Sequence, residues 1–284
     1  MAKRITIALL TFFIFFIAKP LYAGERPHSL GISFKYAYHD YKETNEPEWF
    51  KSNETGFLPG IQITYNYEGI KNPLYLRLLF EYEENKTDYD GGIQDVATQT
   101  VTPMQAKTNN KFNTWEGNIG FTFKPWTKEQ PVNITVYTGI GYRYWNRGLG
   151  GQAPYSEEYT WKYIPFGVRA AYSINEKWKG GFEIAAWFIY DAEIRVNFSE
   201  IDPNFNNPIA KLGNRMGWKI EVPIIYQFSD RWSLNFVPSY ENYSFGESEF
   251  FPITYGGAST SLVAKEPDSR TNIYSIRLGI KFHF

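Results

Sequence analysis

The C-terminal stretch Thr271–Phe284 reads T-N-I-Y-S-I-R-L-G-I-K-F-H-F, and it decides the fold. From its fourth residue onward, every second side chain is apolar: Tyr274, Ile276, Leu278, Ile280, Phe282 and Phe284. The side chains between them are polar, charged or absent. A strict period of two indicates a β-strand with one apolar and one polar face.

The same alternation recurs along the chain. It predicts about ten strands, near residues 30–41, 61–67, 74–83, 115–124, 134–145, 159–172, 182–191, 218–228, 232–240 and 271–284. Short connections alternate with long ones, the long ones being about 43–56, 85–111, 148–155, 196–214 and 246–270. This pattern predicts an all-β fold: a single antiparallel transmembrane β-barrel with short periplasmic turns and long extracellular loops.

The final strand resembles the closing strand of bacterial outer-membrane β-barrels, and the size and loop pattern resemble the small opacity-type barrels. In that family the alternating pattern that ends in Phe is read by the barrel-assembly machinery. The resemblance therefore implies that the six apolar residues of the final strand form an assembly signal, with that machinery as a partner and the outer membrane as the location.

The N-terminus predicts export. Lys3 and Arg4 precede an apolar run from Ile5 to Ile17, and a small-residue site ends at Ala23. We interpret residues 1–23 as a cleaved signal peptide and residues 24–284 as the barrel domain. The mean hydropathy of −0.42 fits lumen-facing polar residues that alternate with lipid-facing ones. The net charge of −1, more negative without the basic leader, argues against nucleic-acid binding.

Tryptophans gather near the expected strand ends. Three lie at short turns and four near long loops, which predicts two aromatic girdles: Trp126, Trp178 and Trp232 at one interface, and Trp115, Trp145, Trp161 and Trp218 at the other. Pro165, Pro223 and Pro238 interrupt predicted strands. Because proline cannot donate to a ladder, we expect bulges or a local loss of pairing there.

The polar faces predict a charged lumen. Its expected members are Lys35, Arg77, Glu81, Glu83, Glu116, Lys124, Arg143, Arg169, Glu183, Asp191, Lys219, Glu221, Glu241, Arg277 and Lys281. In a narrow barrel, charges of mixed sign should pair, because a lone buried charge is costly. This favours a lumen plugged by side chains, in a structural or surface-binding protein. A narrow solute-selective channel is the alternative.

A second alternative is an outer-membrane hydrolase. Omptin proteases are ten-stranded, with paired aspartates in the second outer loop and an Asp/His pair in the fourth. Here the second loop holds Asp88 and Asp90, but the fourth holds Asp202 without a histidine. The resemblance therefore covers the architecture. His39 with Glu81 or Glu83 is a different candidate acid/base pair.

The sequence predicts contacts outside the barrel as well. Aromatic residues in the outer loops predict contact with a surface ligand. Outer-membrane lipid and lipopolysaccharide are the other expected partners. Asp88-Tyr-Asp90-Gly-Gly lacks the full ligand set of a calcium loop, so we expect neither a metal nor a cofactor.

Overall fold

The computed structural model describes residues 26–44, 52–94, 101–123, 132–151 and 154–284. The leader, Lys124 and Trp126 lie outside these residues. The wall of the barrel consists of β1 (His28–Glu43), β2 (Asn53–Glu68), β3 (Leu74–Gln94), β4 (Val101–Phe123), β5 (Val132–Leu149), β6 (Tyr155–Ser173), β7 (Trp178–Val196), β9 (Met216–Glu221) with β10 (Ile224–Gln227), β11 (Trp232–Phe245) and β14 (Ser269–His283).

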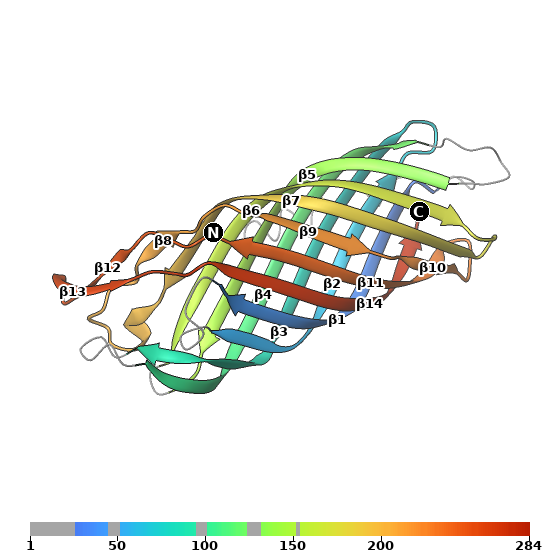
Figure 1. The fold of residues 1–284 in the computed structure, drawn as a ribbon. Helices are drawn as coiled ribbons and strands as arrows, with labels where there is room; N and C mark the ends of the chain where they lie inside the picture. The colour runs from blue at the N-terminus through green and yellow to red at the C-terminus, as the bar shows by residue number, and fades with distance from the viewer. Residues whose placement is uncertain (1–25, 45–51, 95–100, 124–131, 152–153) are drawn as a thin grey trace.

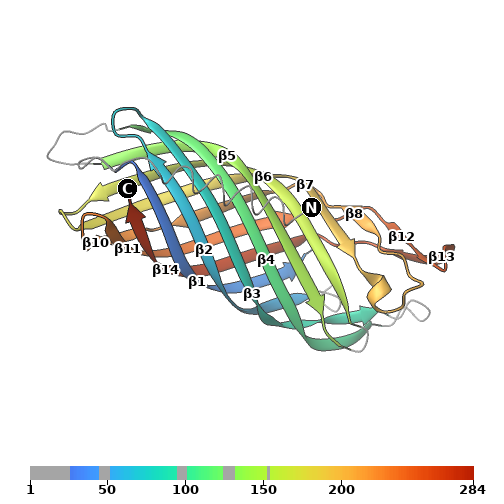
Figure 2. The same ribbon diagram turned by 180° about the vertical axis from the view of Figure 1, so that it is seen from behind.

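The barrel closes between its last and first strands. β14 pairs with β1 in an antiparallel ladder from Glu43↔Ser269 to Ser29↔His283, and with β11 on its other edge. β9 and β10 together fill one wall position between β7 and β11, so the wall has ten positions. Figures 1 and 2 show strongly tilted strands, with the C-terminus near one end and the β12–β13 hairpin at the other. The predicted ten-stranded antiparallel barrel is confirmed.

Alternation places apolar side chains outside. On β1, Ile32, Phe34 and Tyr36 are exposed, whereas Lys35 and Ala37, which alternate with them, are fully buried. The outward apolar band ends at an outer belt of aromatic side chains, beyond which outward residues are polar: Tyr38 on β1, Tyr82 on β3, Trp115 on β4 and Tyr240 on β11 belong to this belt. An outward apolar band flanked by aromatics is the lipid-facing surface of a membrane barrel.

The three prolines have different effects. Pro223 separates β9 from β10, and neither ladder beside it includes residues 222 and 223. Pro238 lies opposite Val222 and keeps its place in the β11–β14 ladder. Pro165 keeps its pairing with β7, but the β5–β6 ladder skips residues 164 and 165. The expected loss of pairing therefore occurs at Pro165 and Pro223.

The extracellular end has more structure than the loop assignments predicted. Much of the expected 85–111 loop is a continuation of β3 and β4, which stay paired up to Gln94↔Val101. The expected 196–214 loop contains a short 3-10 helix, η1 (Phe198–Glu200), and β8 (Ile209–Lys211). The expected 246–270 loop contains the separate hairpin of β12 (Phe251–Tyr255) and β13 (Ala258–Ala264).

Three residue predictions are wrong. Trp145 and Trp161 are buried inside the barrel and belong to no girdle. They occupy inward positions of their strands, whereas Trp115, Trp178, Trp218 and Trp232 are exposed. Asp191 does not face the lumen: it has a φ of 54° at a register shift between β6 and β7, and it pairs with Lys162 on the exposed surface. A bulge of this kind redirects the side chain of the extra residue.

Candidate functional site

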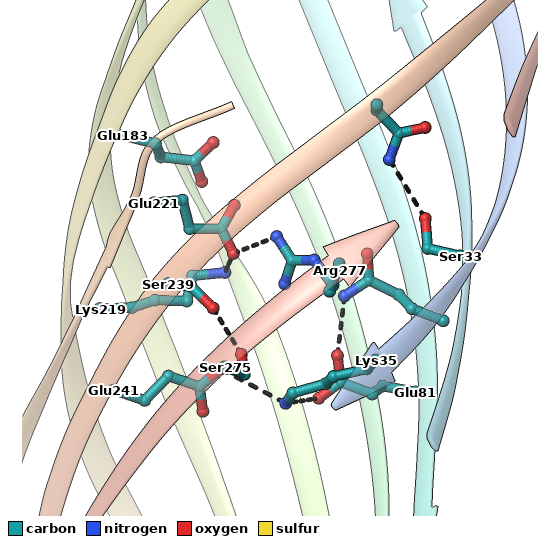
Figure 3. A network of polar contacts seen from close by, with 12 residues as sticks. Ser33, Lys35, Glu81, Glu183, Lys219, Glu221, Ser239, Glu241, Ser275 and Arg277 are labelled. Carbon is teal, nitrogen blue, oxygen red and sulfur yellow. Dashed lines mark hydrogen bonds and ion pairs between the residues drawn. The ribbon is translucent and has the colours of Figure 1, made fainter. Parts of the chain in front are cut away.

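The middle of the barrel interior contains a buried set of charges, called here the central network. Its cations are Lys35, Arg77, Arg143, Lys219 and Arg277, and its carboxylates are Glu81, Glu83, Glu116, Glu183, Glu221 and Glu241. β2 and β6 add the uncharged partners Gln62 and Tyr163. Every one of the ten wall positions therefore contributes a side chain, and Figure 3 shows several of them converging inside the barrel.

Lys35 is the centre of one part of this network. Its Nζ lies 2.8 Å from Glu81, 3.1 Å from Glu83 and 3.9 Å from Glu241. Arg143 also binds Glu241, at 3.0 Å, so one carboxylate joins cations from opposite parts of the wall. The arrangement crosses the lumen and does not merely line it.

Arg77 and Arg277 anchor two further groups. Arg77 donates to both carboxylate oxygens of Glu183, at 2.9 and 3.1 Å, and pairs with Glu116 at 3.3 Å. Arg277 lies 2.7 Å from Glu221, which also contacts Lys219 at 3.2 Å. Buried charges require such partners, because breaking one pair strands an uncompensated charge in a poorly solvated interior.

An aromatic layer lies on the extracellular side of the central network. Trp145 stacks on Phe112 at 5.2 Å and on Tyr159 at 4.6 Å between ring centroids. Trp161 contacts Phe245 edge-on at 5.0 Å. Large aromatic side chains fill space efficiently and pack well in offset or edge-on pairs. The interior above the network is therefore a packed core.

A second polar group, the outer cluster, lies above this layer: Tyr41, Glu43, Glu54, Arg147, Glu157, Tyr159 and Glu266. It is beyond the outer aromatic belt, at the level where outward residues such as Lys42 are polar. Arg147 pairs with Glu54 at 2.8 Å and with Glu157 at 3.0 Å. The cluster thus holds four carboxylates around a single cation.

Glu266 has no cation to itself in the outer cluster. It follows β13 and accepts hydrogen bonds from the hydroxyls of Tyr159, at 2.7 Å, and Tyr41, at 3.4 Å. Burial, together with the nearby Glu157 and Glu43 carboxylates, raises the pKa of Glu266 well above its ordinary value.

Side chains leave little free space in the central network. The cavity among Glu81, Thr114, Arg143, Lys219 and Arg277 measures about 10 Å³. A cavity needs about 10–15 Å³ to hold one water molecule. Within the described part of the interior, this level therefore has room for about one water.

The candidate hydrolase residues do not form one site. Asp88 and Asp90 are exposed, and Asp88 pairs with Lys107 on the outer surface of the β3–β4 hairpin. His39 is fully buried, with rings of Phe112 and Trp145 beside it, and neither of its nitrogens has a hydrogen-bond partner among the described residues. Glu81 and Glu83 instead bind Lys35. These described residues therefore do not form a general base that is held in place by a partner, as hydrolysis would require.

Two residues expected in the lumen do face the interior but lie outside the central network. Arg169 and Lys281 line a cavity near the periplasmic end and are only partly buried. The outer cluster was not predicted from the sequence. The alternation along β5 could have predicted it. Arg143, Trp145 and Arg147 lie two positions apart from one another in turn and therefore face the same side, and all three are buried.

The described residues contain no group of three or more His, Cys, Asp or Glu side chains arranged to hold a metal ion. In the same part of the chain, no helix has the length and apolar character that a membrane crossing requires.

Comparisons with known proteins identify the fold. No protein-family model and no curated protein sequence matches the chain. The outer membrane protease OmpT from Escherichia coli matches with a TM-score of 0.63 at 11% identity, over 94% of this chain and 99% of OmpT. The translocator domain of the autotransporter NalP from Neisseria meningitidis matches with a TM-score of 0.45 at 9% identity, over 100% of this chain and 98% of that domain. The ten-stranded barrel seen in the structure is thus the fold of the bacterial outer-membrane β-barrel proteins.

Proposed function

We propose that this protein is a closed outer-membrane barrel that acts through its extracellular end, as a structural or surface-binding protein. The observation that carries the proposal is the central network. All ten wall positions contribute to it, and the cavity within it measures about 10 Å³. A solute path would have to displace ion pairs that are buried on all sides, at a high cost in electrostatic energy.

The extracellular end supports the binding part of the proposal. Tyr255 of β12 donates a hydrogen bond to Asp202 at 3.0 Å, and its ring meets Phe205 at 5.0 Å. These contacts hold the β12–β13 hairpin against the segment after η1. Large apolar side chains remain exposed on this end, among them Phe250, at 69%, and Val263, at 61%. Preordered exposed apolar groups are suited to contact with a partner.

The outer membrane is the proposed location, reached after removal of the leader at residues 1–23. The fold and the outward apolar band support this placement. Lipopolysaccharide remains a proposed partner, because the exposed Lys86 of β3 lies just beyond the outer belt and suits a phosphate group.

The alternatives have weaker support. A channel would need a continuous water path, and a hydrolase would need the acid/base contact that His39 lacks. OmpT is a protease by its name, but a likeness at 11% identity extends to the fold only.

Conductance of purified protein in planar lipid bilayers tests the proposal. We expect no stable unitary steps from the wild type. The comparison variant removes two cations and two carboxylates of the central network, so its net charge is unchanged: Lys35→Ala, Glu81→Ala, Arg143→Ala and Glu241→Ala. It should conduct, because the loss of four long side chains opens space in the lumen. Steps from this variant show that insertion and detection work. Stable unitary steps from the wild type would contradict the closed barrel and support the solute-selective channel.

A further inference from the structure

A cavity of about 120 Å³ lies at the periplasmic end of the barrel interior. We call it the inner mouth. Its charged lining residues are Arg26, Glu68, Arg169, Lys179 and Lys281, and His28 and His283 also line it. A single water molecule needs about 10–15 Å³. The inner mouth therefore has room for several waters or for one tetrahedral oxyanion.

The charges of the inner mouth do not balance. Glu68 is its only lining carboxylate among the described residues, and this carboxylate is bound to Arg169 at 3.0 Å. Neither Lys281 nor the exposed Lys179 makes a direct hydrogen bond or ion pair with a described side chain, although the charge of Glu68 attracts both of them. In the central network, by contrast, each of the five cations lies within 4 Å of a carboxylate.

Lys281 is the most informative of these residues. It occupies an inward position of β14, and its Cε lies 3.8 Å from the position that a Cβ on Gly31 would take. The side chain therefore lies over a bare stretch of the neighbouring strand, inside the barrel. Holding an unpaired ammonium there, close to a second cation, costs free energy unless an anion joins them.

We propose that the inner mouth is a binding site for a phosphate group. Lys281 and Lys179 supply the point charges, and Arg169 supplies planar N–H donors beside them. Arginine and lysine together are the usual recognition set for phosphate oxygens. The uncharged amides of Asn133 and Gln227 line the same cavity and add donors at its rim.

The wall beside the inner mouth indicates two sources for this phosphate. Gly181 and Pro223, which face each other where the ladder is interrupted, both line the cavity. Trp178 and Tyr226, whose rings pack at 4.8 Å, mark the inner interface just below that break. A free phosphate would enter from the periplasm, whereas the headgroup of a phospholipid in the inner leaflet would enter over the rim of the barrel at this interface.

The test uses full-length protein folded in an uncharged maltoside detergent. Isothermal titration calorimetry measures binding of inorganic phosphate in one arm and of short-chain phosphatidylglycerol in the other, with short-chain diacylglycerol as the phosphate-free lipid. The test variant is Lys179→Gln with Lys281→Gln. Its matched control is Lys42→Gln with Lys211→Gln, which removes the same charge from the extracellular end.

We expect saturable binding to the wild type and to the control, and binding at least roughly tenfold weaker, or about 1.4 kcal/mol, in the test variant. Added salt should weaken it. Binding of inorganic phosphate identifies the free anion as sufficient. Binding of phosphatidylglycerol alone identifies the lipid headgroup.

A second measurement guards against misfolding of the variant. At a fixed phosphate concentration, the thermal midpoint of the heat-modifiable barrel should rise clearly in the wild type and much less in the test variant, because the variant binds phosphate more weakly. The proposal is overturned if neither phosphate compound binds the wild type, if diacylglycerol binds equally well, or if test and control variants bind alike.

Discussion

At the scale of single residues, Glu266 gives the sharpest prediction. Burial and neighbouring carboxylates raise its pKa, so the folded protein holds this proton more tightly than the unfolded chain does. The stability that results is fully present below the ordinary carboxyl pKa of about 4.3 and is lost as the pH rises through the folded value. Glu266→Gln should therefore raise the free energy of unfolding at pH 8 by roughly 1–2 kcal/mol.

Urea unfolding in detergent, followed by tryptophan fluorescence, measures this difference. The curves for wild type and Glu266→Gln should meet at pH 4, because both side chains are then neutral. Glu249→Gln, on an exposed side chain of the same segment, should follow the wild type throughout. A stability difference that stays constant from pH 4 to pH 8 would contradict the proposed ionisation cost.

Residues also show the limits of prediction from sequence. Trp145 and Trp161 lie near loops, as girdle tryptophans do, yet their inward parity buries them. Parity in turn fails at Asp191, because the register shift beside it adds a residue to β7 and turns its side chain outward. Alternation predicts a facing direction only while the ladder stays regular.

At the scale of elements, the break between β9 and β10 constrains Gly181 of β7. A Cβ there would lie 2.8 Å from the carbonyl oxygen of Ala170 and 3.1 Å from Cγ of Pro223. Gly181→Ala should therefore lower the free energy of unfolding by roughly 1–3 kcal/mol, the usual cost of overpacking. The neighbouring Gly180→Ala should be tolerated, since its nearest contact is Cδ1 of Ile174 at 3.6 Å.

A double-mutant cycle assigns the cause. Pro223→Ala removes one of the two close contacts, so it should recover part of the stability lost in Gly181→Ala. Urea unfolding of the two single variants and the double variant measures the coupling. Strictly additive effects would mean that Pro223 does not press on β7 at this position.

Element boundaries were predictable inside the membrane and less so above it. Strands that cross the bilayer must alternate, because one face meets lipid and the other meets the interior. Residues 85–94 continue β3 beyond the outer belt, where both faces carry polar side chains. Apolar and polar residues no longer alternate regularly in this segment, although it stays paired with β4. The sequence therefore indicated a loop where the structure has a hairpin.

At the scale of the whole molecule, the number of strands and the charged interior followed from the sequence, whereas the partners of each charge did not. Lys35 and Glu241 are far apart in the chain and meet only because the barrel closes. Spacing within one strand contains no information about which carboxylate lies across the lumen. The outer cluster and the inner mouth escaped prediction for the same reason.

Closure itself supplies the last prediction. Phe284 exchanges backbone hydrogen bonds of 2.9 and 3.1 Å with His28, and its ring stacks on His28 at 5.5 Å. These contacts seal only the edge of a long β1–β14 ladder, so deleting Phe284 should cost little stability. If the terminal Phe is also an assembly signal, the deletion should sharply lower the amount of heat-modifiable barrel in cell membranes while refolding into detergent stays near the wild-type level. Trp232→Ala serves as the control, because it removes an aromatic ring that packs on Phe282 from the neighbouring β11 and leaves the assembly signal intact. Equal losses in cells and in detergent would assign Phe284 to stability alone, and normal barrel in cells would remove it from the assembly signal.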